Sequence, residues 1–301
     1  MTVVVTGAAG FIGRHLVASL AAQGHSVVGV DRHDSEGPAV QHIVADLLDA
    51  DDVVDTALRE ATAVFHLAGC PGVRDQAPDV AHRRWRDNVL AAERVLAAVP
   101  LTTPLVVTSS SSVYGGATGR GCREDDPVRP RGGYAMSKVE VERRCLARLC
   151  AGGSVAIARP FTVAGEGQRS DMAFAQWIEA ARAGLPLQVL GSGARTRDVT
   201  DVRDVVRALM MLGMTEGTGL VNIGTGRAHR LDTLAALVSE VTHAPAELRV
   251  VPADPDEAVH TRADTTRLER LTGFVPTTDL RALVARQYAA ACEGMSTVAA
   301  R

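Results

Sequence analysis

The sequence lacks long apolar runs and a strong excess of either charge. No hydrophobic stretch approaches the ~18 residues that span a bilayer. The opening residues have no basic segment followed by an apolar one, so they predict a strand and not a signal peptide. Among the 301 residues, 32 are basic and 35 acidic, which gives a formal net charge of −3. We therefore expect neither nucleic acid nor a membrane as a partner.

Lysine and cysteine are scarce as well. The five cysteines are odd in number and lack the spacing of a zinc site. They predict reduced thiols, no metal site and a cytoplasmic location. Of the 32 basic side chains, only Lys138 is a lysine. A position that stays lysine in an arginine-rich chain indicates a need for an ammonium, whose hydration and pKa differ from those of a guanidinium.

Apolar β-branched runs alternate with helical patterns through the first half. The predicted strands are 3–6, 26–30, 42–45, 63–67, 105–109 and 154–159, and the helices between them are 13–23, 50–60, 80–98 and 134–150. Strands apolar on both faces, joined by helices, predict an α/β fold with a doubly wound parallel sheet. Residues 174–183 and 231–242 are predicted as helices of a smaller α/β cap that binds the substrate at the edge of the sheet.

A glycine-rich turn directly follows the first predicted strand. Gly7, Gly10 and Gly13 permit a tight turn, bring backbone N–H groups to a pyrophosphate and let a helix pack closely. Asp31 ends the second strand, where a carboxylate binds the adenosine ribose and repels a 2′-phosphate. This register is typical of a Rossmann dinucleotide site. The neighbouring Arg32 would tolerate NADPH, so the motif favours NAD over NADP without excluding it.

Tyr134 and Lys138 lie four residues apart on a predicted helix and therefore share a face. An ammonium and a nicotinamide cation both stabilise phenolate. Lowering a phenol pKa from ~10 to ~7 requires roughly 4 kcal/mol. We thus expect Tyr134 to act as general base and acid on a substrate hydroxyl. The alternative is an ordinary amphipathic helix, but Tyr134 is one of three tyrosines.

A run of serines from Ser109 to Ser112 follows the strand 105–109. Hydroxyls at the carboxyl end of a strand point into the ligand cleft, where one can bridge a substrate oxygen and Tyr134. The alternative is a serine-rich loop that only caps the next segment. The two interpretations are equally consistent with the run itself.

Together these motifs resemble the extended short-chain dehydrogenase/reductase family of NAD-dependent nucleotide-sugar epimerases and dehydratases, along nearly the whole chain. The resemblance implies that Ser110 is the catalytic hydroxyl, that Tyr134 is the base and that Lys138 binds the nicotinamide ribose. It assigns 1–161 and part of 196–226 to the NAD-binding domain, the rest of 162–292 to the cap and 293–301 to a tail. The further cofactor contacts that it implies are Phe11, Ile12, Asp46, Leu47, Leu67, Ala68, Gly69, Asn88 and Pro160.

The residues after Ser110 bear on the type of reaction. The 4,6-dehydratases of the family place an Asp-Glu pair there, whereas this chain has Ser111 and Ser112. Dehydration and decarboxylation are therefore disfavoured. The pattern is most similar to UDP-glucuronate 4-epimerases, which implies that Thr162 and Arg169 hold the sugar carboxylate. The alternative is that Arg169 binds pyrophosphate or lies on the surface. The other substrate contacts implied are Arg74, Ser110, Ser111 and, for the pyrophosphate, Arg197.

Three positions depart from that branch. Ala164 replaces a tyrosine of that branch, and Leu190 replaces an aromatic residue that would stack on uracil. Asp254 lies near the sequence position where the branch has an arginine that would hold the nucleotide. Either other residues take these roles or the substrate carries another nucleotide or none.

We predict an NAD-dependent C4 epimerase that forms a transient 4-keto sugar, with UDP-glucuronate as the first candidate. One alternative is an NAD(P)H-dependent 4-ketoreductase. Others are an enzyme for a non-UDP or nucleotide-free sugar and, remotely, a non-catalytic dinucleotide sensor. By resemblance, helices 80–98 and 134–150 pair across a homodimer.

Overall fold

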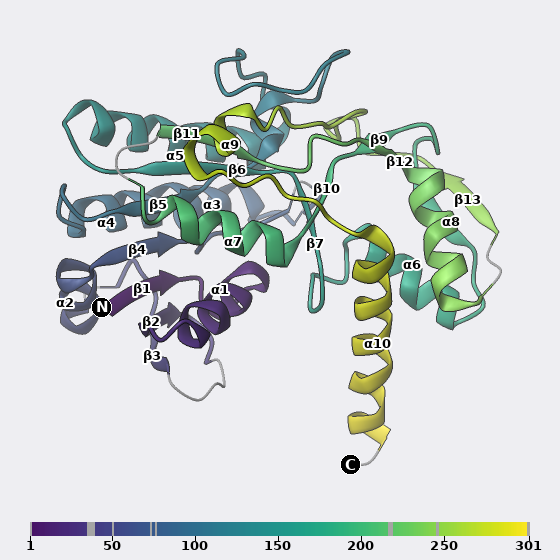
Figure 1. Cartoon of the computed structure of the whole chain (residues 1–301), viewed down its shortest axis with the longest axis horizontal. Coiled ribbons are helices and arrows are strands. Elements are labelled where there is room, and N and C mark those ends of the chain that lie inside the picture. The colour runs from purple at the N-terminus through teal and green to yellow at the C-terminus, as the bar shows by residue number, and fades with distance from the viewer. Residues whose placement is uncertain are drawn as a thin grey trace.

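A seven-stranded parallel sheet forms the centre of the larger part of the protein (Figure 1). The structure, a computed structural model, describes residues 2–34, 40–49, 51–72, 74–75, 77–215, 219–244 and 247–299. The strand order is β11-β6-β5-β4-β1-β2-β3, and all neighbours pair in parallel. These strands are β1 Thr2–Thr6, β2 Ser26–Asp31, β3 Val40–Val44, β4 Ala63–His66, β5 Leu105–Thr108, β6 Ala156–Pro160 and β11 Gly219–Ile223. The predicted doubly wound Rossmann sheet is confirmed.

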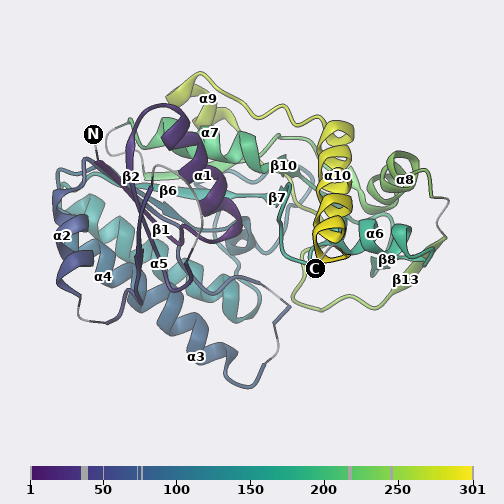
Figure 2. The same ribbon diagram turned by 90° about the horizontal axis from the view of Figure 1, so that it is seen from below.

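Helices cover both faces of the sheet (Figure 2). Along β1, Val3 and Val5 pack in one core cluster and Val4 packs in the other. Because successive strand side chains point to opposite faces, a strand buried on both sides must be apolar throughout. On one face lie α1 Phe11–Ala22, α7 Val202–Leu212 and α9 Thr266–Thr272. On the other lie α2 Asp52–Glu60, α3 Val80–Arg84, α4 Ala91–Ala98 and α5 Gly132–Cys150.

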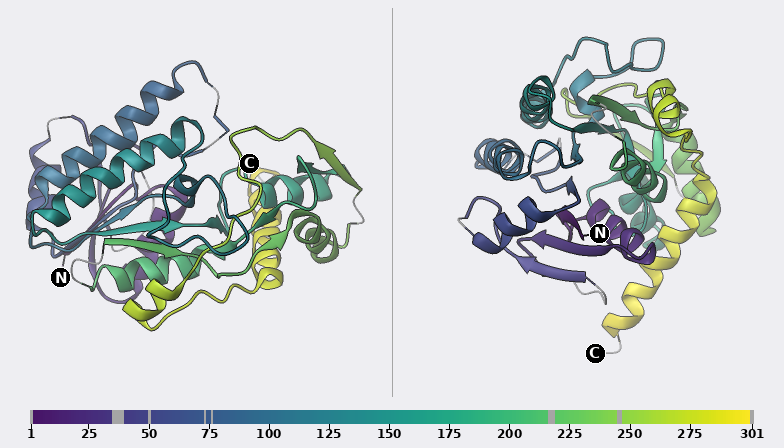
Figure 3. Two further views of the ribbon diagram at one scale, coloured as in Figure 1. Left: turned by 90° about the horizontal axis from the view of Figure 1, so that it is seen from above. Right: turned by 60° about the vertical axis from the view of Figure 1, so that its left-hand side comes forward.

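The cap lies beside the carboxyl ends of these strands (Figure 3). Its core contains Phe174, Trp177, Leu187, Leu234 and Leu283. The elements that contribute are α6 Ala173–Arg182, β8 Leu187–Leu190, α8 Leu231–Thr242, β13 Leu248–Val251 and α10 Leu280–Ala299. Short strand pairs connect the two parts, namely β7 Thr162–Ala164 with β10 Val199–Asp201 and β9 Thr196–Arg197 with β12 His229–Arg230. Among the described helices, none combines the length and apolar composition that crossing a membrane requires.

The structure differs from the predicted boundaries at three places. The expected helix 80–98 is interrupted by a π-helical segment, η1 Trp85–Leu90. Leu268 of α9 packs in the core cluster with α7, so this stretch joins the sheet and not the cap. Helix α10 continues to Ala299, so residues 293–299 extend a helix and are not a separate tail. Of these features, η1 and α9 have packing partners that lie far away in the sequence.

Candidate active site

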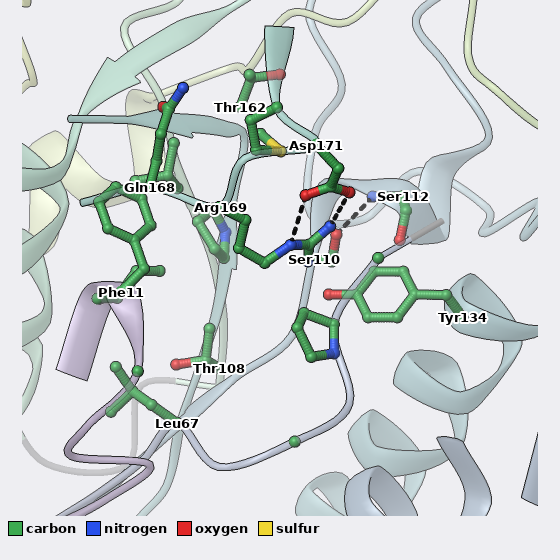
Figure 4. A pocket seen from close by; sticks show the side chains of 18 of the residues that line it. Phe11, Leu67, Thr108, Ser110, Ser112, Tyr134, Thr162, Gln168, Arg169 and Asp171 are labelled. Carbon is green, nitrogen blue, oxygen red and sulfur yellow. Dashed lines mark hydrogen bonds and ion pairs between the residues drawn. The ribbon is translucent and has the colours of Figure 1, made fainter. Parts of the chain in front are cut away.

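A cavity of about 930 Å³ lies between the carboxyl ends of the sheet strands and the cap. Such a crevice forms where the strand order reverses, here between β1 and β4. Most predicted site residues line it, and Figure 4 shows several of them facing one another. The predicted residues that line the cavity are Gly7, Gly10, Phe11, Ile12, Gly13, Asp31, Arg32, Asp46, Leu47, Leu67, Ala68, Gly69, Arg74, Ser110, Ser111, Tyr134, Pro160, Thr162, Arg169 and Arg197.

The glycine turn after β1 leaves no room for side chains. Gly7 has a φ of +73°, and a Cβ there would lie 2.5 Å from the Ala68 nitrogen. A Cβ at Gly13 would lie 2.0 Å from the Gly7 oxygen, so α1 packs directly against the turn. Helix α1 follows Gly10, which has no side chain to cap the first N–H groups. This cradle fits a pyrophosphate, because free N–H groups at a helix N-terminus bind anions.

The adenosine end carries a cluster of paired charges. Asp31 accepts hydrogen bonds from the Ala9 nitrogen at 3.1 Å and the His33 nitrogen at 3.0 Å. Arg32 pairs with Asp87 at 3.1 Å and lies 3.8 Å from Asp46. These acids neutralise Arg32, so it is less able to attract a 2′-phosphate, which favours NAD over NADP.

Arg86 binds both of these acids, Asp46 and Asp87, at 2.8 Å. Burial acts to raise the pKa of Asp46, but hydrogen bonds from the Leu48 nitrogen and Arg86 hold that pKa below its usual value. Asp46 therefore lines the cavity as a carboxylate whose charge is already shared with two arginines.

Replacing Asp31 by asparagine is expected to weaken NAD binding about tenfold, since a charge-assisted hydrogen bond contributes about 1.5–3 kcal/mol. The dissociation constant is measured by titrating NAD into protein stripped of cofactor. Asp52→Asn, an exposed position in the first turn of α2, is the matched control and should leave the constant unchanged. Equal affinities for both variants and the unmodified protein would contradict the assignment.

Ser110 and Tyr134 meet at the centre of the cavity (Figure 4). The Ser110 hydroxyl lies near enough to the Tyr134 phenol to favour its ionised form, and Ser110 Oγ accepts a hydrogen bond from the Ser112 nitrogen at 3.1 Å. The latter bond caps the 3₁₀ turn η2 Ser111–Tyr114. The segment after strand β5 thus positions the Ser110 hydroxyl, and α5 positions the Tyr134 phenol. This placement agrees with the predicted pair.

Lys138 lies behind this pair and does not line the cavity wall. Its Nζ donates to the Thr108 carbonyl oxygen at 2.9 Å, and a Cβ at Gly69 would lie 3.7 Å from it. Burial lowers the pKa of Lys138 to about 8, so the amine remains mostly protonated at neutral pH. The ammonium is thus held between the loop after β4 and the end of β5.

The predicted lowering of the Tyr134 pKa includes the positive charge of a bound nicotinamide, which the protein side chains alone do not supply. Burial raises the pKa of Tyr134, although the Ser110 hydroxyl and the positive charge of Arg169 act in the opposite direction. Desolvation of the phenolate outweighs these two contributions. The nicotinamide cation of bound NAD would add to the stabilisation of phenolate.

Asn88 does not reach the cavity, contrary to the prediction of a cofactor contact. The π-helical segment places it in the interior, where Oδ1 accepts from the Cys70 nitrogen at 2.8 Å. Its Nδ2 donates to Ser137 Oγ at 2.8 Å and to the Cys70 oxygen at 3.2 Å. Asn88 therefore ties the loop after β4 to α5 and so positions Gly69 and Lys138. π-Helical segments often occur at functional sites.

Arginines and acids gather at the cap side of the cavity. Glu257 accepts from Arg74 at 3.0 Å, lies 3.2 Å from Arg197, and has Arg195 at 3.7 Å. Three arginines thus surround the single carboxylate of Glu257. The cluster has a net positive charge, which suits the binding of a diphosphate. Nothing in the local sequence around Glu257 signals this role, because its partners come from other parts of the chain.

Two buried hydroxyls line the cavity without a hydrogen-bond partner among the described residues. These are Thr108 Oγ1 and Ser112 Oγ. Buried polar groups are normally hydrogen-bonded, so the lack of a partner at these two hydroxyls is unusual. The sequence places Thr108 in the predicted strand 105–109 and Ser112 in the serine run after it, and neither was assigned a ligand contact.

Comparison with known proteins agrees with this geometry. A family model described as "NAD dependent epimerase/dehydratase family" matches residues 3–224. UDP-glucose 4-epimerase of Mycolicibacterium smegmatis is 32% identical over 92% of this chain and 94% of its own. MoeE5, solved with UDP-glucuronic acid and NAD, is 37% identical with a TM-score of 0.89, covering 98% of this chain and 100% of that one.

UDP-glucuronic acid 4-epimerase of Bacillus cereus, solved with UDP-glucuronic acid and NAD, is 27% identical with a TM-score of 0.90. That likeness covers 97% of this chain and 99% of the other. Sequence and structure agree over essentially the whole length. The chain therefore belongs to the NAD-dependent epimerase/dehydratase family and is an NAD-dependent sugar-nucleotide epimerase of the extended short-chain dehydrogenase/reductase type.

Proposed function

We propose that this enzyme inverts C4 of a sugar nucleotide through a transient 4-keto intermediate, with UDP-glucuronate as the first candidate substrate. The observation that carries the proposal is the placement of Ser110, Tyr134 and Arg169 together in the cavity, where Ser110 and Arg169 both favour the ionised form of the phenol. Ser111 and Ser112 stand where a dehydratase has acids, and a hydroxyl is too weak a base to remove a carbon-bound proton at C5.

In this proposal Tyr134 removes the proton from O4, and Ser110 donates a hydrogen bond to the same oxygen. NAD, when bound, would supply the acceptor and donor of the C4 hydride, with which the configuration at C4 is inverted. Lys138 holds positive charge behind the phenol and stabilises its ionised form. The glycine turn holds the pyrophosphate of the cofactor, and Asp31 holds its ribose. Tyr134 then returns the proton to O4.

The ligands bound to a solved relative are consistent with either a carboxylate or a hydroxymethyl group at C6 of the substrate sugar. MoeE5 was solved with UDP-glucuronic acid and also with UDP-glucose. Thr162 and Arg169 line the cavity as the carboxylate interpretation requires. Leu190 lines it too, without the aromatic ring expected for uracil stacking. Arg74, Arg195 and Arg197 supply positive charge for the diphosphate. Asp254 lies near the sequence position where the branch has a further arginine.

The test is incubation of the purified enzyme with UDP-glucuronate and substoichiometric NAD. We expect UDP-galacturonate to accumulate well beyond the amount of NAD present, because each turnover regenerates the cofactor. Proton NMR of the sugar ring distinguishes the two epimers. Consumption of reduced nicotinamide in proportion to a 4-keto sugar would instead identify a ketoreductase. The proposal fails if no UDP-hexose or UDP-hexuronate is converted.

We further infer a homodimer in which α5 pairs with the helical segments of residues 80–98. Trp85, Leu90 and Met136 expose apolar surface on these segments, which supports the inference. The cytoplasmic location likewise stays a prediction from the thiol content.

A further inference from the structure

Helix α1 contacts two different parts of the cavity wall. Its first residues, Phe11 to Gly13, line the cavity directly after the glycine turn that fits a pyrophosphate. The next two residues, Arg14 and His15, reach the segment that leads from β7 to Arg169. One helix therefore joins the cofactor cradle to a loop on the substrate side of the cavity.

His15 bonds the backbone of the turn formed by residues 165–168. Its Nε2 lies 2.9 Å from the carbonyl oxygen of Glu166. Because a carbonyl oxygen can only accept, Nε2 carries a proton and donates this hydrogen bond. The imidazole also meets the Phe11 ring edge to face, with 5.8 Å between the ring centroids. Phe11 lines the cavity, so His15 connects the cofactor end of α1 with the turn.

The neighbouring carbonyl oxygens of the turn 165–168 are held in the same way. Arg14 donates Nη2 to the Gly167 oxygen at 2.6 Å. From the opposite side, the buried Gln287 of α10 donates Nε2 to the Gly165 oxygen at 2.7 Å. Three consecutive carbonyl oxygens are thus bonded by side chains of α1 and α10. Such bonds fix the place of the turn between the cofactor cradle and the cap.

The turn leads directly into a residue expected to contact the substrate. Arg169 follows Gln168, and Figure 4 shows both side chains with Phe11 at the cavity. Arg169 lies near enough to Tyr134 for its charge to act on the phenol. A shift of the turn would therefore move the guanidinium relative to a sugar that is held at Tyr134.

We propose that His15 is a positioning residue for substrate binding, which places Arg169 relative to the cofactor cradle by holding the turn 165–168. This inference rests on the proposed function, in which Arg169 contacts the sugar. Arg14 lines the cavity, whereas His15 is not among the lining residues. His15 therefore acts through the turn, and its replacement tests the tie without removing a ligand contact.

The test is His15→Phe, which keeps an aromatic ring beside Phe11 but removes the donor. We expect KM for UDP-glucuronate to rise about fivefold, a change of about 1 kcal/mol for one hydrogen bond. The value of kcat and the dissociation constant of NAD should stay unchanged. The variant should fold, because Arg203 and Arg286 still bind the Glu166 carboxylate at 2.7 Å and 3.0 Å.

Two further variants separate the hydrogen bond from the ring. His15→Gln supplies an amide N–H donor and should restore most of the unmodified KM. His25→Phe is the matched control, because His25 follows α1 and lies outside the cavity lining, and its KM should not change. If His15→Phe folds poorly, His15→Leu removes the same donor.

Hydrogen exchange of the NAD-loaded protein, without nucleotide sugar, measures the tie directly. We expect the backbone amides of residues 165–172 to exchange about fivefold faster in His15→Phe than in His25→Phe. Equal exchange in the two variants, or a loss of NAD affinity as large as the rise in KM, would overturn the inference. A protein that converts no UDP-sugar would refute the proposed function, while the exchange rates still decide whether His15 holds the turn.

Discussion

Tyr134→Phe is expected to lower kcat for epimerisation by about two to four orders of magnitude, because general acid–base catalysis contributes about 10²–10⁴-fold. The variant keeps the ring but loses the phenol oxygen whose ionised form Ser110 favours. Binding of NAD should persist, since the glycine turn and Asp31 lie elsewhere in the cavity. The measurement is the initial epimerisation rate at saturating UDP-sugar, with NAD binding followed by titration.

The matched control is Tyr288→Phe, which removes the same oxygen from a tyrosine packed against the cap core. We expect it to retain the unmodified kcat. Loss of activity in Tyr134→Phe together with loss of NAD binding would indicate a structural defect. A Tyr134→Phe enzyme with the unmodified kcat would contradict the role of Tyr134 and would revive the non-catalytic alternative.

Glu142→Gln is expected to lower the free energy of unfolding by about 3–5 kcal/mol, the cost of leaving one partner of a buried ion pair unpaired. Arg159 donates to Glu142 Oε1 at 2.7 Å and to Oε2 at 2.6 Å. The side chains of Arg159 and Glu142 are 2% and 5% exposed, so water cannot solvate the Arg159 guanidinium once its carboxylate partner is lost. Denaturant unfolding followed by circular dichroism measures the change.

This ion pair is part of a polar network that reaches Ser109, the neighbour of Ser110. Ser109 donates to Glu142 at 2.5 Å, and Arg159 donates to the Tyr114 hydroxyl at 2.8 Å. Tyr114 in turn donates to Asn222 at 2.7 Å, which joins β5, β6 and β11 below Ser110. Because Ser109 adjoins Ser110, the variant should also place the catalytic hydroxyl less accurately.

Glu140→Gln is the control on the same helix. Glu140 pairs with Arg143 and Arg144 in a more exposed position, and such pairs contribute about 0–1 kcal/mol. We expect a correspondingly small loss. Equal losses for Glu140→Gln and Glu142→Gln would show that the buried network does not stabilise the fold.

Part of the site was predictable because its geometry is local. The glycine turn between β1 and α1 follows from short-range sterics, and the four-residue spacing of Tyr134 and Lys138 follows from helix periodicity. Ser110 was placed by its position directly after a strand. These residues lie in the structure where the sequence predicts them, apart from Lys138, which stands behind the cavity wall.

Other features were not predictable because they depend on partners distant in the chain. Asn88 lies in a π-helical segment and binds Cys70 and Ser137, so its burial is a result of packing. Helix α9 joins the sheet because Leu268 completes a core cluster built from the first and third quarters of the chain.

The sequence by itself determined the Rossmann sheet and the glycine turn, and it predicted the residues for oxidation and reduction at a carbinol carbon, since each rests on periodicity or short-range backbone geometry. Only the tertiary structure decided how the charges around the substrate are paired. Arg74 and Arg197 meet at Glu257, and Asp171 already binds Arg169. Side-chain pairing depends on distance in space, which sequence spacing does not determine once the chain passes from one domain to the other.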